Sequence, residues 1–204
     1  LNALHPGRIE LGLGRAPGTD QHTAYALRRN LTSDADQFPR DVLELQHYFR
    51  EAEPGQAIRA VPGEGQNVPL WILGSSLYGA QLAAALGLPY AFASHFAPQA
   101  LMQAVSIYRE RFEPSAQLAE PYVMVGCSAI VADSEDEARK LFTSPQQQFV
   151  HRMRGGCVKL PPPIDDIETF WSPMEKAQAP SMLSCAFHGS TETIMEKLAP
   201  LIEA

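Results

Sequence analysis

Residues 68–94 (VPLWILGSSLYGAQLAAALGLPYAFAS) constrain the fold more than any other part of the chain. Within them, the apolar run at 69–73 predicts a strand, residues 77–86 predict an Ala-rich helix, and residues 90–94 predict a second buried strand. Gly87 comes where that helix is expected to end. Because a helix joins the two strands, the strands should be parallel neighbours in one sheet.

The turn between the first of these strands and the helix consists of Gly74, Ser75 and Ser76. Small residues leave backbone N–H groups accessible, and the start of the following helix carries the positive end of the helix dipole. Both features favour binding of an anion such as a phosphate group. The alternative is that Ser75 only caps the helix.

Two further apolar runs extend the pattern, at residues 8–13 and 122–132. The sequence therefore predicts an α/β fold with about four parallel strands. Helices are predicted at residues 24–29, 38–49, 101–112, 135–142 and 190–204. Residues 159–180 are rich in proline, and we expect them to form an irregular lid or interface. The pattern leaves open whether the sheet is doubly wound or part of a (β/α) barrel, but in both the working loops follow the carboxyl ends of the strands.

Two side chains with useful chemistry follow predicted strands. Arg15 lies in a glycine-rich loop after residues 8–13, and its glycines do not have the spacing of a dinucleotide-binding fingerprint. We interpret Arg15 as a cation near a phosphate, with a surface ion pair as the alternative. His95 directly follows residues 90–94, where it can donate a hydrogen bond or carry a proton, or serve a structural role.

Composition excludes several classes of protein. A net charge of −7 argues against a nucleic-acid partner, because such proteins bind phosphate backbones with an excess of Lys and Arg. No apolar run is long enough to span a membrane. Cys127, Cys157 and Cys185 have no metal-ligand spacing, and they indicate a reduced, cytoplasmic protein without a metal site.

Three segments of the chain resemble the bacterial luciferase-like monooxygenases, in particular their luciferase-like oxidoreductase branch. They are HPGRIELGLGRAPGTDQ (5–21), WILGSSLYGAQLAAALGLPYAFASHFAP (71–98) and YVMVGCSAIVADSEDEARKLF (122–142). The resemblance runs over nearly the whole chain in matching order and spacing. It implies a TIM-type (β/α) barrel, here incomplete, in which residues 1–204 form one domain that lacks N-terminal and C-terminal barrel strands.

The resemblance also implies a cofactor and a reaction. Family members use reduced FMN and O2 to oxidise a small organic substrate, and a separate flavin reductase supplies the reduced FMN. In that family an arginine and small hydroxyl residues hold the flavin phosphate, and the positions that match here are Arg15, Ser75 and Ser76. Gly74 and Gly79 allow the backbone to approach the cofactor closely. His95 is the candidate catalytic residue.

The resemblance leaves two other interpretations of function open. One is a non-catalytic flavin-binding or structural remnant of a luciferase-like barrel, and the other is a deazaflavin-dependent oxidoreductase. Relatives that oxidise sulfonates carry an arginine and a histidine where this chain has Gly126 and Ser128, which argues against a sulfonate substrate. Exposed strand edges in a partial barrel predict a homodimer or a higher oligomer.

Overall fold

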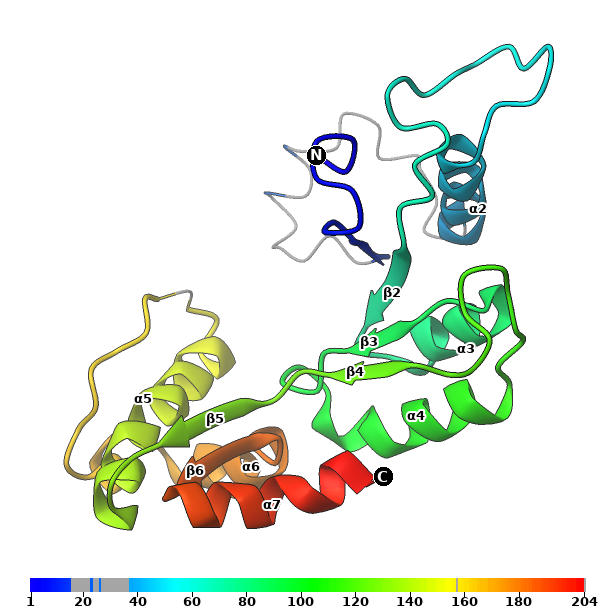
Figure 1. Cartoon of the computed structure of the whole chain (residues 1–204). Helices are drawn as coiled ribbons and strands as arrows, with labels where there is room; N and C mark the ends of the chain where they lie inside the picture. Colours follow the sequence, from blue (N-terminus) through cyan, green and yellow to red (C-terminus); the bar gives the residue numbers. More distant parts are fainter. Residues whose placement is uncertain (16–22, 24–25, 27–36, 157, 204) are drawn as a thin grey trace. The chain divides into compact units, whose positions relative to one another are not determined.

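The computed structural model describes residues 1–15, 23, 26, 37–156 and 158–203. The described chain divides into two compact units. Unit 1 comprises Leu1–Phe92 and Ala100–Val125, and unit 2 comprises Ala93–Gln99 and Gly126–Ala204. In both units parallel strands pack against helices, so the predicted α/β class is confirmed (Figure 1).

Unit 1 is built on a four-stranded parallel sheet with the order β1-β2-β3-β4 (Figure 1). The strands are β1 (Leu11–Gly14), β2 (Leu70–Gly74), β3 (Tyr90–Phe92) and β4 (Val123–Val125). In the register, Gly14 of β1 lies opposite Leu73 of β2, and Gly74 lies opposite Phe92 of β3. The carboxyl ends of the first three strands therefore lie at the same edge of the sheet.

In the described part of unit 1, three α-helices accompany the sheet. They are α2 (Phe38–Phe49), α3 (Leu77–Leu86) and α4 (Leu101–Glu110), the last preceded by a short 3-10 turn, η2 (Pro98–Ala100). Helix α3 packs on β2 and β3 through small buried residues, and α4 packs on α3. Gly87 ends α3 in the left-handed conformation (φ 61°), as predicted, and a Cβ there would come within 2.5 Å of the Glu113 carbonyl oxygen.

Unit 2 contains a two-stranded parallel sheet formed by β5 (Ser128–Val131) and β6 (Ala186–Gly189). Its helices are α5 (Glu135–Met153), η3 (Ile167–Thr169), α6 (Pro173–Met182) and α7 (Thr191–Glu203). The predicted start of α5 is confirmed, since the Ser134 hydroxyl accepts a hydrogen bond from the Glu137 N–H at 3.2 Å. The helix runs beyond the predicted end at residue 142 and continues past Pro145.

The structure corrects three sequence predictions of local structure. Residues 122–132 do not form one strand but two, β4 and β5, which belong to different sheets. Between them, the Gly126 carbonyl accepts a hydrogen bond from the Ser94 hydroxyl. Residues 159–180 are not irregular throughout, because they contain η3 and most of α6. Strand β6 was not predicted.

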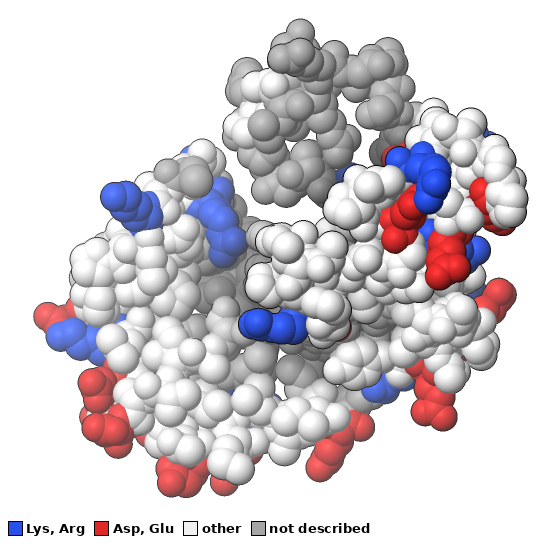
Figure 2. Space-filling model, turned by 45° about the horizontal axis from the view of Figure 1, so that its top comes forward, with Lys and Arg blue, Asp and Glu red and all other residues white. Residues whose placement is uncertain are grey.

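Several predictions concern particular residue types. Apart from residue 26, the helix predicted at residues 24–29 lies outside the described residues, as does Cys157. Cys127 and Cys185 are free thiols. In the described ranges, no three His, Cys, Asp or Glu side chains are arranged to hold a metal ion. None of the described helices combines the length and hydropathy needed to cross a bilayer. On the face shown in Figure 2, Lys and Arg side chains lie apart from one another on a largely neutral surface.

Candidate functional site

The turn between β2 and α3 presents an uncapped helix start. Strand β2 ends at Gly74, Ser75 follows, and Ser76 occupies the N-cap position with extended backbone angles (φ −141°, ψ 162°). The Ser76 side chain makes no capping hydrogen bond, and Ser76 is exposed. The hydroxyl and the first backbone N–H groups of α3 are therefore available to an anionic ligand.

Two glycines let the helix start lie directly on the strand end. Gly79 is buried in the first turn of α3, and a Cβ there would lie 3.2 Å from Cε2 of Tyr90 and 3.7 Å from Cα of Gly74. A Cβ on Gly74 would in turn lie 3.8 Å from Cα of Gly79. The close approach predicted for these glycines is thus an approach of strand and helix to each other.

A buried tyrosine supports the turn from the core. Tyr90 of β3 has no exposed surface, and its hydroxyl donates a hydrogen bond to the Ser76 carbonyl at 3.1 Å. Burial raises the pKa of the Tyr90 phenol, so the hydroxyl stays protonated and keeps donating at neutral pH. Sequence reasoning missed this role. The sequence shows a tyrosine within an apolar strand, but the group that accepts its hydrogen bond depends on how α3 packs over β3.

Arg15 lies at the same helix start. It directly follows β1, whose parallel pairing with β2 puts Gly14 opposite Leu73. The Arg15 guanidinium carbon lies 4.2 Å from the centroid of the Tyr78 ring, and Tyr78 is in the first turn of α3. Within the described ranges, no carboxylate forms an ion pair with Arg15. The structure thus brings Arg15 together with the β2–α3 turn; that these residues bind a phosphate stays a prediction.

His95 is the candidate catalytic residue predicted from the sequence. It lies in an exposed turn after β3 and belongs to unit 2, whereas the β2–α3 turn belongs to unit 1. Its ring centroid is 4.3 Å from that of Phe96, which is also exposed. The catalytic role of His95 stays a prediction.

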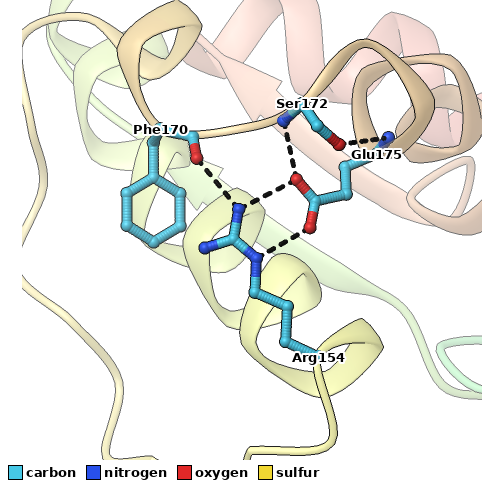
Figure 3. A network of polar contacts seen from close by, with 4 residues as sticks. All are labelled: Arg154, Phe170, Ser172 and Glu175. Carbon is cyan, nitrogen blue, oxygen red and sulfur yellow. Dashed lines mark hydrogen bonds and ion pairs between the residues drawn. The ribbon is translucent and has the colours of Figure 1, made fainter.

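Unit 2 contains a second polar cluster, in which an arginine is paired with a carboxylate (Figure 3). Nε and Nη2 of Arg154 donate to the two carboxylate oxygens of Glu175 at 2.8 and 2.9 Å, and Nη2 also donates to the Phe170 carbonyl at 3.2 Å. The Ser172 N–H donates to the same carboxylate at 2.6 Å. Since Glu175 neutralises this guanidinium, we assign the cluster a structural role in joining α5 to α6.

The structural comparisons place this geometry among known proteins. The family model described as luciferase-like monooxygenase matches residues 1–204. The crystal structure of apo-MsnO8 matches with a TM-score of 0.80 and 28% identity, over 99% of this chain and 61% of that chain. A coenzyme F420 dependent tetrahydromethanopterin reductase from Methanopyrus kandleri matches with a TM-score of 0.56 and 15% identity, which shows a shared fold alone. It covers 97% of this chain and 66% of that chain.

Sequence relatives agree with these matches. A luciferase-like monooxygenase of Escherichia coli (strain K12) is 52% identical over 99% of this chain, and the Bacillus subtilis (strain 168) protein YvbT is 48% identical over 100% of it. This chain spans 60% of the length of each of these two relatives. An N-acetyl-S-alkylcysteine monooxygenase of Bacillus subtilis is 37% identical over 46% of this chain and 29% of its own length. The predicted family and TIM-type fold class are thereby confirmed.

Proposed function

The chain belongs to the luciferase-like monooxygenase family, and from this premise we propose that it is an oxidoreductase that uses reduced FMN and O2 to oxidise a small organic substrate. The observation that carries the choice of cofactor is the position of Arg15 beside the uncapped start of α3. A terminal phosphate is what distinguishes FMN from riboflavin, and a cation at a helix N-terminus suits that group.

Each residue of the turn contributes a different group to the binding of the cofactor. Arg15 supplies the positive charge, Ser75 and Ser76 supply hydroxyl groups, and the first N–H groups of α3 supply backbone donors. Gly74 and Gly79 have no side chain, so the start of α3 lies directly on the end of β2 and its N–H groups are held at the turn. These groups fix one end of the cofactor and thereby orient its ring.

Reduced flavin supplies the electrons for oxygen chemistry when it is bound. The protein has to orient the ring, exclude water and manage protons. We assign the proton-carrying role to His95, because an imidazole ring carries both a hydrogen-bond donor and an acceptor nitrogen. We further propose a separate flavin reductase as the electron donor, a cytoplasmic location and a homo-oligomeric state.

Two other functions use the same turn. A flavin-binding protein without turnover would keep the phosphate site, and so would a deazaflavin-dependent oxidoreductase, whose cofactor also carries phosphate. The match to the F420-dependent enzyme shows the fold alone, because its sequence is only 15% identical. The N-acetyl-S-alkylcysteine monooxygenase has the higher sequence identity of the two, 37% over 46% of this chain. We therefore favour FMN and a monooxygenase reaction.

Oxygen uptake tests the proposal. Reduced FMN is added to the protein, and O2 consumption is compared with that of reduced FMN alone; the proposal predicts O2 uptake that depends on the protein. FMN affinity is measured in parallel for the parent, for Arg15→Ala and for Arg40→Ala, which removes an exposed arginine of α2 as a charge control. Losing one charge-assisted contact should weaken FMN binding in Arg15→Ala by about 1.5–3 kcal/mol, or about 10- to 150-fold.

The outcomes separate the candidates. Tight FMN binding without protein-dependent O2 uptake supports the non-catalytic flavin-binding protein. Tighter binding of a deazaflavin than of FMN supports the deazaflavin-dependent oxidoreductase. Equal FMN affinity of Arg15→Ala and the parent contradicts the assignment of the phosphate site. If neither cofactor binds, both flavin interpretations are wrong for this chain.

A further inference from the structure

Arg15 is held by an aromatic ring rather than by a carboxylate. Its guanidinium carbon lies 4.2 Å from the Tyr78 ring centroid, within the range of a cation–π interaction. Both residues belong to unit 1, and Tyr78 is half-buried. Among the described residues, no acidic side chain competes for Arg15 through an ion pair.

This kind of contact leaves the arginine able to bind an anion. The five N–H donors of a guanidinium point outward in its plane, whereas a cation–π contact draws on charge and uses no N–H as a hydrogen-bond donor. A carboxylate partner has the opposite effect, as Arg154 shows: Nε and Nη2 donate to Glu175, which also cancels the charge (Figure 3). Tyr78 can therefore fix the position of Arg15 and leave its charge and donors for a ligand.

The helical turn that carries Tyr78 is itself held in place by the core of unit 1. Tyr78 is the second residue of α3, two positions after the uncapped Ser76. The helix start is fixed by the contact of Gly79 with Gly74 and Tyr90, and by the Tyr90 hydrogen bond to the Ser76 carbonyl. A cation held by Tyr78 thus keeps a fixed relation to the first N–H groups of α3.

We propose that Tyr78 is a positioning residue that preorganises Arg15 for a phosphate group and so makes the site prefer FMN to riboflavin. The inference rests on the proposed function and adds to it the residue that sets this preference. Positioning of Arg15 by Tyr78 affects only the binding of the phosphate group. It should therefore not change the affinity for riboflavin, which lacks the phosphate.

The test compares dissociation constants for FMN and riboflavin in the parent, Tyr78→Leu and Tyr78→Phe. Tyr78→Leu should weaken FMN binding by about 3- to 10-fold, the size of a partly shielded cation–π contact, and leave riboflavin binding unchanged. Tyr78→Phe keeps the aromatic face and should retain the affinity of the parent for FMN. In an Arg15→Ala background, Tyr78→Leu should cause no further loss, because the two residues act as one unit.

Three results would overturn this role. They are an unchanged FMN affinity in Tyr78→Leu, an equal loss for FMN and riboflavin, and a Tyr78→Phe variant as weak as Tyr78→Leu. The first of these, together with a weakened Arg15→Ala, would reject Tyr78 alone and leave the proposed function standing. If Arg15→Ala binds FMN as the parent does, the phosphate site itself is wrong, and the inference falls with it.

Discussion

A single phenol links the core of unit 1 to the candidate phosphate site. Tyr90 is fully buried, packs 5.6 Å from the ring of Tyr108, and reaches the Ser76 carbonyl with its hydroxyl. Gly79 lies against the Tyr90 ring, where a Cβ would come within 3.2 Å. The position of the helix start is therefore set by packing and hydrogen bonding from the core of unit 1.

Replacing Tyr90 by phenylalanine tests this support. Tyr90→Phe removes one buried hydrogen bond, so the free energy of unfolding should fall by about 1 kcal/mol, and FMN binding should weaken because the turn is less well held. Chemical denaturation and FMN titration measure the two effects.

Tyr108→Phe is the matched control. The Tyr108 hydroxyl donates to the Leu88 carbonyl at 2.9 Å and accepts from the Tyr122 N–H at 3.1 Å, away from the turn. This variant should lose at least as much stability as Tyr90→Phe and keep the FMN affinity of the parent. If both variants lose FMN affinity in proportion to their loss of stability, Tyr90 has no specific role at the turn.

At the level of residues, the sequence predicted the local structure of the candidate site and missed the side chains that support it. The turn Gly74, Ser75 and Ser76 was predicted because a strand, small residues and a helix follow one another along the chain; that these residues bind a phosphate stays a prediction. The contacts of Tyr78 and Tyr90 could not be identified, because they depend on which strand lies beside which and on which face of α3 packs inward.

Among the secondary-structure elements, α6 shows how one carboxylate can define a helix start. Glu175 accepts the Ser172 N–H, and the Ser172 hydroxyl accepts the Glu175 N–H, which makes a capping box. Arg154 at the end of α5 donates twice to the same carboxylate. The hydrogen bonds from Arg154 first, and then from the Ser172 N–H, lower the pKa of Glu175 to about 2.

This pKa predicts how stability depends on pH. Folding lowers the pKa of Glu175 from 4.5 to about 2, so the ionised carboxylate favours the folded state. The stabilisation is fully present above pH 4.5 and is lost as the pH falls towards 2. Denaturation midpoints measured across this range should drop less steeply in Glu175→Gln than in the parent.

A second variant checks the cause. Arg154→Gln removes the hydrogen bonds that lower the pKa of Glu175 most and leaves the Ser172 N–H in place. Between pH 4.5 and 2, its denaturation midpoint should therefore fall less steeply than that of the parent but more steeply than that of Glu175→Gln. Parallel profiles for the parent and both variants would show that the pair does not control acid stability.

Prediction of the elements depended on how strongly local patterns pointed to one structure. The bounds of α3 were predicted because an apolar helix pattern ends at a glycine. The start of α6 has the Ser-x-x-Glu pattern of a capping box and a proline at the first helical position, but the neighbouring prolines favoured an irregular segment. The division between β4 and β5 could not be predicted, since residues 122–132 are apolar on both sides of Gly126.

For the whole molecule, the family match and the described sheet give a consistent account. Sheet β1-β2-β3-β4 is parallel, as a luciferase-like barrel requires, and the chain spans 60% of the length of its Escherichia coli relative. In the described part of the sheet, β1 and β4 each have a neighbour on one side only. Exposed apolar side chains such as Leu73 (42%) and Met124 (52%) support the proposed homo-oligomeric state.

The sequence pattern predicts an anion site but no organic substrate, for a physical reason. A phosphate is recognised by a short backbone turn with one cation, and both leave a recognisable pattern of glycine, serine and arginine. An organic substrate is recognised by the shape of a pocket, which several distant segments form together. That shape has no local sequence pattern.

The most direct test of the central claim is a crystal structure of the chain with bound FMN. The account predicts that the phosphate accepts hydrogen bonds from the Arg15 guanidinium, from the hydroxyls of Ser75 and Ser76, and from the first N–H groups of α3, with Tyr78 still stacked on Arg15. An FMN phosphate bound away from the β2–α3 turn, or an Arg15 side chain directed away from that phosphate, would contradict it.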